Sequence, residues 1–290
     1  MPKALSKSYN LRKKIWHRFL RRPITLSRAY DRKVKNPELT VIFLHGISAT
    51  SDTWRMTFKQ FSKAPELKRV RLIALDLLGF GKSLQTDWLD YDYNDYETAL
   101  EQTLIKLKIT GPVVIVGHSM GSLIAASFAV TRHSYEDANI VRLILVSPPV
   151  LMSNELARMP DRVYSKSYGS LQKLAKEEPV MEVIANLVQR FSSFNSSYIK
   201  TPAFGRSMEQ VILNPKNFQT FCKLKTPTLI VHGHFDPLVM RSNLKQVAIK
   251  NPNVRFISVI GHHDISAQKR SKIFIELKQV LREEKEKREN

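Results

Sequence analysis

Short runs of apolar, mostly β-branched residues recur along the chain and predict six strands. They are Thr40–Leu44, Arg69–Leu75, Pro112–Val116, Val141–Val146, Thr228–Val231 and Val254–Ile260. Most of these runs are continuous and do not alternate with polar residues, as is typical of strands buried on both faces of a parallel sheet. The pattern therefore predicts a sheet that is covered on both sides.

Apolar residues at spacings of three and four predict helices between these strands. Examples are Thr53–Phe61, Tyr93–Leu107 and the small-residue stretch Gly121–Val130. A last amphipathic helix is predicted over Ile273–Leu281, and the charged residues 282–290 are expected to fray. Because strands and helices alternate, we expect an α/β fold with a mostly parallel central sheet flanked by helices.

The alternation stops after residue 150 and resumes at Thr228, and the residues between show a helical pattern, for example Met181–Phe191. An insertion between strands lies beside their C-terminal ends, so we expect Phe204 and Met208 to influence substrate preference more than stability. The expected units are a basic N-terminal segment (1–39), a core (40–150 and 224–290) and an inserted all-helical cap (151–223).

The composition is that of an ordinary globular protein, with 43% hydrophobic and 25% charged residues among 290. The single cysteine, Cys222, excludes an internal disulfide and a cysteine-based zinc site. The basic N-terminus is not followed by an apolar run of signal-peptide length, and no stretch approaches the roughly 20 apolar residues of a membrane span. We therefore expect a cytoplasmic protein.

The net charge of +20 is concentrated at the N-terminus, where residues 1–40 hold twelve Lys or Arg against two Asp or Glu. Residues 11–20 carry apolar side chains on one half of a helical wheel and basic ones on the other. Such a helix can lie on an anionic membrane, which would make the protein membrane-peripheral. The alternatives are that it packs on the core or that the charge only solubilises the surface.

The strand Pro112–Val116 runs into Gly117-His118-Ser119-Met120-Gly121, and a small-residue helix follows. This is the G-x-S-x-G nucleophile elbow in its context of strand, tight turn and helix. Glycine is needed on both sides because helix and strand come close together. Ser119 would then lie at a helix N-terminus, which favours a developing negative charge.

Candidates for the acid and the base follow the last two predicted strands. Asp236 comes after Thr228–Val231, in a turn where it could orient a histidine. The adjacent His262 and His263 come after Val254–Ile260 and are both candidates for the base. Nucleophile, acid and base thus appear in the order Ser, Asp, His, each after a strand.

An oxyanion hole needs two backbone N–H groups near the nucleophile. One candidate is the N–H of Met120, directly after Ser119. The other is the N–H of Ile47, in the loop after Thr40–Leu44, where Gly46 allows a close approach to substrate.

With these motifs in place, the sequence resembles the α/β-hydrolase fold superfamily over about residues 40–150 and 224–282. The resemblance implies a mostly parallel sheet, a helical cap and a Ser-His-Asp triad, with no cofactor and no metal. It is carried by four motifs in order, namely His45-Gly46 after a strand, the D-x-x-G-x-G-x-S stretch Asp76–Ser83, the elbow 117–121 and the G-x-x-D-P stretch Gly233–Pro237.

The sequence departs from the family at two places. Members usually open with two antiparallel strands, whereas here the region before Thr40 is basic and weakly patterned. Members also often have Glu-x-Pro after the histidine, and here Gln268-Lys269-Arg270 stands in its place.

The family register favours His263 over His262 as the base. Counted from His263, the apolar positions of the family's last helix fall on Ile273, Leu277 and Val280. Counted from His262, they fall on polar residues. A glycine directly before the histidine is usual in the family and favours His262, which stays the alternative.

Other chemistries fit the sequence less well. Gly81-Lys82-Ser83 could end a phosphate-binding loop, but the first glycine of that motif would be position 76, which is Asp76. Relatives with an aspartate nucleophile are excluded by Ser119. No histidine pair has the spacing of a zinc protease, and no nucleic-acid-binding module is recognisable.

We therefore expect a serine hydrolase that acts on a small-molecule ester or similar acyl compound through an acyl-enzyme. Ser119 would attack, the histidine would take its proton, and Asp236 would orient the histidine. The alternatives are a C–C bond hydrolase or an acyltransferase on the same fold, and a non-catalytic binding protein.

Overall fold

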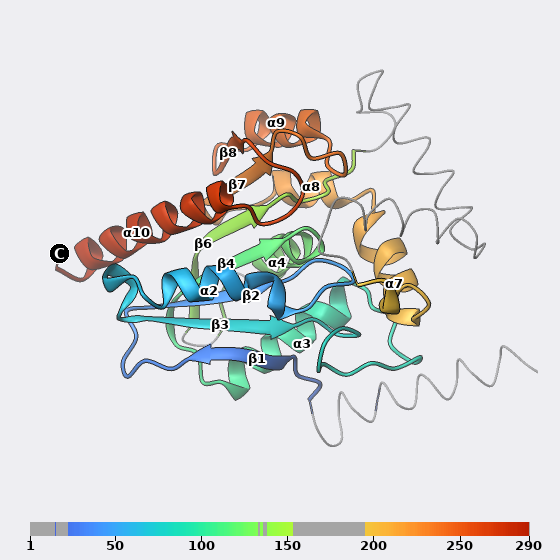
Figure 1. The fold of residues 1–290 in the computed structure, drawn as a ribbon, viewed down its shortest axis with the longest axis horizontal. Helices are drawn as coiled ribbons and strands as arrows, with labels where there is room; N and C mark the ends of the chain where they lie inside the picture. Colours follow the sequence, from blue (N-terminus) through green and yellow to red (C-terminus); the bar gives the residue numbers. More distant parts are fainter. Residues whose placement is uncertain (1–14, 16–22, 133, 136–137, 153–194, 290) are drawn as a thin grey trace, which may run out of the picture.

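A single central sheet organises the computed structural model, which describes residue 15 and residues 23–132, 134–135, 138–152 and 195–289 (Figure 1). In this part of the chain the sheet has eight strands in the order β1-β3-β2-β4-β6-β7-β8, and β5 pairs with β6. The pairings of β1 with β3 and of β5 with β6 are antiparallel, and the others are parallel. The strands are β1 (Ser27–Arg32), β2 (Leu39–Leu44), β3 (Val70–Asp76), β4 (Gly111–His118), β5 (Ser134–Tyr135), β6 (Ala138–Val146), β7 (Thr228–Gly233) and β8 (Val254–Val259). All six predicted strands are confirmed.

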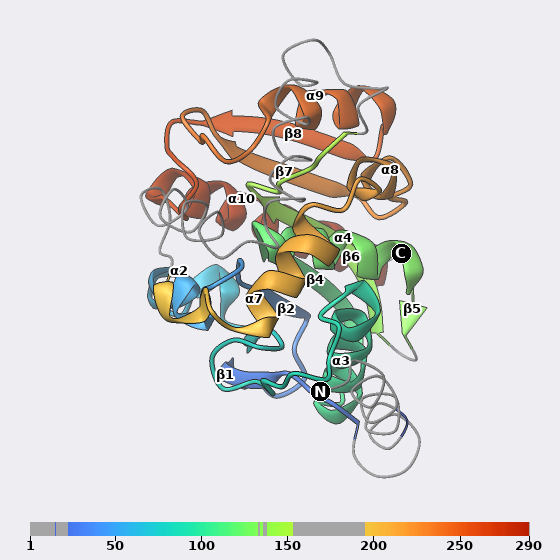
Figure 2. The same cartoon turned by 90° about the vertical axis from the view of Figure 1, so that its right-hand side faces the viewer.

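Helices cover both faces of the sheet, as Figures 1 and 2 show. One apolar core joins the sheet to α2 and α10, and a second core on the opposite face joins it to α3, α4, α8 and α9. The helices are α2 (Arg55–Phe61), α3 (Tyr93–Lys106), α4 (Met120–Thr131), α7 (Pro202–Ser207), α8 (Asn217–Cys222), α9 (Arg241–Lys250) and α10 (Ala267–Glu289), with short turns η2 (Ser51–Trp54), η3 (Pro65–Leu67), η4 (Ser196–Tyr198) and the π-helical η5 (Met208–Ile212). The expected α/β architecture is confirmed.

Strand β1 lies within the basic N-terminal segment, where the sequence predicts no strand. It is an edge strand whose residues are all partly or fully exposed, so it lacks the apolar run that marks the buried strands. Arg32 fastens its end by donating hydrogen bonds to the carbonyls of Leu67 and Val70. The helix expected over residues 11–20 lies outside the described residues, apart from Ile15.

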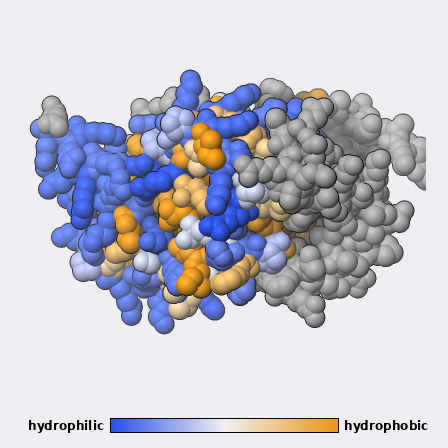
Figure 3. Space-filling view, turned by 90° about the horizontal axis from the view of Figure 1, so that it is seen from above, coloured by the Kyte–Doolittle hydropathy of each residue, from blue (hydrophilic) through white to orange (hydrophobic). Residues whose placement is uncertain are grey.

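Helix α10 continues to Glu289, so the expectation that the tail frays is wrong for residues 282–289, and residue 290 lies outside the described residues. Charged residues hold this end in place, since Lys287 pairs with Glu284 and Arg288 donates to the carbonyl of Glu38 at 2.9 Å. The end is nevertheless strongly hydrophilic, as its blue surface in Figure 3 shows. The last buried apolar residue of α10 is Val280, but the helix continues beyond it to Glu289.

The described end of the expected cap, residues 195–223, consists of η4, α7, η5 and α8, in agreement with a helical insertion. The predicted helix Met181–Phe191 lies outside the described residues. Phe204 and Met208 are buried in the core at 0% and 5% exposure. Truncating a buried phenylalanine costs about 3–5 kcal/mol, so we expect Phe204→Ala to lower stability strongly, and the prediction on substrate preference stays untested.

Helix α4 packs unusually close to β2 and β4, and glycine makes this approach sterically feasible. A Cβ on Gly117 would lie 2.5 Å from the carbonyl oxygen of Gly121. A Cβ on Gly121 would lie 2.5 Å from that of His45 and 2.6 Å from that of Leu44. Backbone atoms cannot yield as side chains do, so these two positions fix the height of α4 above the sheet.

We predict that Gly121→Ala lowers the free energy of unfolding by at least about 2 kcal/mol, because the new methyl group overlaps backbone on β2. Gly205→Ala is the matched control. Gly205 lies in α7, and a methyl group added to it would meet no atom within 4 Å, so alanine there should be neutral or stabilising by up to about 1 kcal/mol. Urea unfolding measures both, and equal stabilities for the two variants would contradict the steric account.

Candidate active site

Ser119 forms the sharp turn between β4 and α4. Its backbone has φ +50° and ψ −119°, a conformation that non-glycine residues rarely adopt. The N–H of Ser119 donates to the carbonyl of Val146 at 2.9 Å, which ties the turn to the neighbouring strand β6. Such strain is typical of functional sites. Met120 opens α4, so Ser119 lies at the positive end of that helix.

Asp236 and His263 form a buried hydrogen-bonded pair between the loops after β7 and β8. His263 Nδ1 lies 2.8 Å from Asp236 Oδ2, and His263 and Asp236 are 4% and 8% exposed. Burial raises the pKa of Asp236, but hydrogen bonds from His263, Leu238 and Ser147 outweigh it and lower that pKa to about 2. An ionised carboxylate only accepts, so Nδ1 carries the proton that is shared with Asp236, and Nε2 is the nitrogen that faces away from it.

His262 has a different environment from its neighbour. Its side chain is exposed, and its Nδ1 lies 3.1 Å from the carbonyl oxygen of Phe235. The structure thus brings His263, and not His262, to Asp236. The helix that follows agrees with this register, because Ile273, Leu277 and Val280 are all buried at 1% exposure or less.

His118 connects the elbow to the histidine loop. Its Nε2 lies 3.0 Å from the carbonyl oxygen of His263, and the two imidazole rings have centroids 5.0 Å apart. Burial holds the pKa of His118 well below its usual range, so the ring is neutral near pH 7 and Nε2–H donates. Since His118 precedes Ser119, this contact brings His263 beside the elbow.

The loop proposed for the oxyanion hole is held by the buried His45. The N–H of Leu77 donates to its Nε2 at 2.8 Å, so Nδ1 carries the proton and donates to the carbonyl of Gly46 at 2.7 Å. A Cβ on Gly46 would lie 3.1 Å from Cβ of Ser119. The loop therefore passes directly beside the elbow, and Ile47 follows there at 8% exposure.

The stretch Asp76–Ser83 has a structural role that the sequence analysis did not predict. The Asp76 carboxylate accepts from the N–H of Ser51 at 2.9 Å and from the N–H of Lys82 at 3.0 Å. A Cβ on Gly81 would lie 2.3 Å from this carboxylate. The aspartate and glycine of this motif therefore form a brace that joins the loops after β2 and β3.

The end of the cap is tied to the oxyanion loop. The N–H of Asn195 donates to the carbonyl of Ser48 at 2.9 Å, and the hydroxyl of Ser48 donates back to the carbonyl of Asn195 at 2.7 Å. Tyr198 also accepts from the N–H of Gly81 at 2.9 Å. Sequence reasoning missed Ser48 and Tyr198, because nothing in a helical pattern marks the residues on which a cap rests.

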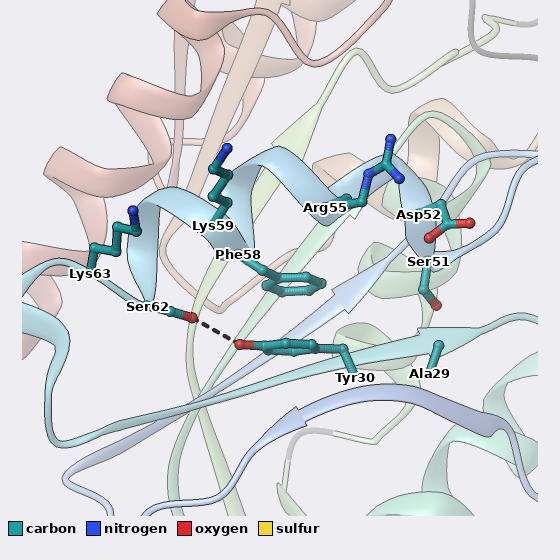
Figure 4. Close-up of a pocket in the computed structure, with 9 residues that line it drawn as sticks. All are labelled: Ala29, Tyr30, Ser51, Asp52, Arg55, Phe58, Lys59, Ser62 and Lys63. Atoms are coloured by element: carbon teal, nitrogen blue, oxygen red, sulfur yellow. Dashed lines mark hydrogen bonds between the residues drawn. The ribbon is translucent and has the colours of Figure 1, made fainter.

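A hollow of about 450 Å³ lies beside α2 (Figure 4). Tyr30 and Phe58 belong to its lining and stack with ring centroids 4.2 Å apart. Ser119, Asp236 and His263 do not line it. Its lining consists of Ala29, Tyr30, Ser51, Asp52, Arg55, Phe58, Lys59, Ser62 and Lys63.

Among the residues that the structure describes, no group of three His, Cys, Asp or Glu side chains is arranged to hold a metal ion. Within the same residues, no helix is both long and apolar enough to cross a membrane.

Comparison with known proteins identifies a family. The family model described as "Alpha/beta hydrolase family" matches residues 41–238, which is more than half of the chain and includes Ser119 and Asp236. Over most of its length the structure superposes on an esterase from Exiguobacterium antarcticum, with a TM-score of 0.65. The match covers 90% of this chain and 99% of the esterase at 18% sequence identity, so it shows the fold alone.

Curated relatives match shorter stretches. The chain is 35% identical over 141 residues to "Probable lysophospholipase BODYGUARD 4" of Arabidopsis thaliana, covering 48% of this chain and 31% of that protein. It is 34% identical over 94 residues to "(E)-2-((N-methylformamido)methylene)succinate hydrolase" of Acinetobacter baylyi, covering 32% of each protein. The chain thus spans about a third of the length of these relatives.

Two buried histidines predict how stability depends on pH. Burial lowers the pKa of both His45 and His232 from 6.5 to about 4. As the pH falls below 6.5, the unfolded chain takes up these protons before the folded protein does. The two histidines therefore do not lower the free energy of unfolding above pH 6.5, and they lower it progressively as the pH falls toward 4. The loss is about 2 kcal/mol for each histidine between pH 7 and pH 5.

Urea unfolding of His232→Asn at pH 7 and pH 5 tests this prediction. The variant should lose less stability between the two pH values than the wild type, whatever its stability at pH 7. The same substitution at the exposed His234 controls for removing an imidazole. A pH dependence equal in His232→Asn and wild type would contradict the prediction.

Proposed function

This chain belongs to the alpha/beta hydrolase family, and from that premise we propose that it is a serine hydrolase that cleaves a carboxylic ester through an acyl-enzyme on Ser119. The observation that carries the proposal is the buried pair in which His263 Nδ1 lies 2.8 Å from Asp236 Oδ2, beside the strained turn at Ser119. A serine becomes nucleophilic when an oriented histidine can take its proton.

In the proposed mechanism, the Ser119 hydroxyl attacks the ester carbonyl while His263 Nε2 takes its proton. Asp236 keeps Nδ1 protonated and stabilises the imidazolium that forms. The N–H groups of Ile47 and Met120 hold the oxyanion of the tetrahedral intermediate. His263 then gives the proton to the leaving alcohol. In the second step His263 takes a proton from the water that attacks the acyl-enzyme. His263 then returns this proton to Ser119 Oγ as the bond to the acyl group breaks, which releases the acid and restores the free enzyme.

The comparisons support an ester as the first substrate class to test. One relative is named as a lysophospholipase and one structural neighbour as an esterase. Another relative is named as the hydrolase of a substituted succinate, so a small carboxylated acyl compound is the second class to test. A series of p-nitrophenyl esters of different chain lengths separates short from long acyl preferences.

We predict that Ser119→Ala and His263→Ala each lower kcat for the best of these esters by several orders of magnitude, because each removes a member of the triad. His262→Ala is the matched control, as it removes the neighbouring but exposed imidazole, and its kcat should stay within a few-fold of wild type. A His263→Ala protein with near-normal kcat would refute the assignment of the base. A folded wild type that turns over no ester or related acyl compound would favour a non-catalytic binding protein.

A further inference from the structure

Lys269 is a fully buried lysine beside the proposed catalytic pair. It is the third residue of α10, and its exposure is 0%. Lysine is among the residues least often buried completely, since its ammonium loses its hydration. The first turn of a helix is also the end where the backbone dipole disfavours a cation. Neither packing nor the helix dipole favours a lysine at this position, so the reason that it is buried there must lie in its hydrogen bonds.

The ammonium group uses its three donors on three oxygens around the histidine loop. Nζ of Lys269 lies 2.6 Å from the carbonyl oxygen of His262, 2.9 Å from that of His263 and 2.9 Å from Oγ of Ser147. The two carbonyls belong to the peptide groups on either side of the His263 Cα atom. Holding both peptide planes fixes the backbone dihedrals of His263 and hence the direction in which its Cα–Cβ bond points.

The third contact reaches the other partner of the pair. Ser147 follows β6 with φ +49°, a strained conformation for a serine, and its side chain helps to lower the pKa of Asp236. Lys269 thus contacts the backbone of His263 directly and also holds Ser147, whose side chain acts on Asp236. The carbonyl of His263 also accepts from His118 Nε2 at 3.0 Å, so the histidine loop is anchored from α10 and from the elbow.

We propose that Lys269 is a positioning residue, which holds His263 and, through Ser147, Asp236 in the geometry that lets His263 act as base. The expected effect on kcat rests on the proposed function. The expected effect on the position of His263 rests only on the hydrogen bonds. Lys269 is the middle residue of Gln268-Lys269-Arg270, which stands where members of the family often have Glu-x-Pro.

The charges around Lys269 give the proposal a pH signature. Burial lowers the pKa of Lys269 to about 8, against the opposing effect of Asp236 and Asp264. His118 and His232 also face it and are neutral at that pH. Below pH 8 the ammonium has three N–H donors, and above it the amine has two. The kcat of the wild type should therefore fall as the pH rises through about 8.

The test is Lys269→Met, which keeps the length and shape of the side chain and removes all three donors. We expect kcat for the best p-nitrophenyl ester to fall about 10- to 100-fold, because a small displacement of a catalytic group has effects of this size. KM should change less than twofold, and the fall above pH 8 should disappear. Lys272→Met removes an exposed lysine from the same helix and should keep the wild-type kcat and pH profile.

Nitrogen-15 NMR of the histidine side chains supplies a readout that does not depend on catalysis. The Nδ1–H signal of His263, bonded to Asp236, should be present in the wild type and shifted or lost in Lys269→Met. If Lys269→Met does not fold, Ser147→Ala provides the same two readouts with one contact removed. A normal signal together with unchanged kcat in folded Lys269→Met would overturn the proposal, even if its stability were lower. A wild type without turnover would refute the proposed function, and the NMR comparison would still decide the role of Lys269.

Discussion

The buried hydrogen bond from His263 Nδ1 to Asp236 Oδ2 is the interaction on which the site depends. A carboxylate taken out of water is tolerated only when its lone pairs are hydrogen-bonded. Here the N–H of Leu238 and the imidazole of His263 supply those bonds, and the side chain of Ser147 also helps to lower the pKa of the carboxyl group. The carboxylate stays ionised and keeps a proton on Nδ1 of the histidine, so Nε2 is the nitrogen that we propose as the base. The surrounding loops bury this pair, so that His263 and Asp236 are only 4% and 8% exposed.

The sheet explains how residues far apart in sequence reach one place. Strands β2, β4, β7 and β8 run parallel, so their C-terminal ends meet at a single edge. The loops that leave this edge carry Ile47, Ser119, Asp236 and His263. Crossover helices separate the strands, and the glycines at the elbow let α4 descend far enough for the turn at Ser119 to project from the edge. The end of the cap then rests on the same loops through its bonds to Ser48.

Sequence reasoning predicted the parts of the molecule whose physics is local. Continuous apolar runs identified the buried strands, and the apolar register of the last helix favoured His263 over His262. Edge strand β1 escaped because its exposed residues carry no apolar signal. The three contacts of Lys269 escaped because they join residues 6 to 122 positions apart, and a charged residue in a helix is ordinarily taken as solvent-exposed. The burial of Phe204 was not predicted for a related reason, since a helical pattern does not say which face is buried.

We propose that Ser119 carries the acyl group between the two steps, and this intermediate can be trapped. The protein is mixed with a p-nitrophenyl ester that it hydrolyses, quenched in acid within the first turnover, and digested for mass spectrometry. We expect an acyl group on the peptide that contains Ser119, formed together with a burst of about one p-nitrophenolate per molecule. An acyl group on another residue, or wild-type turnover with neither a burst nor an adduct, would contradict it.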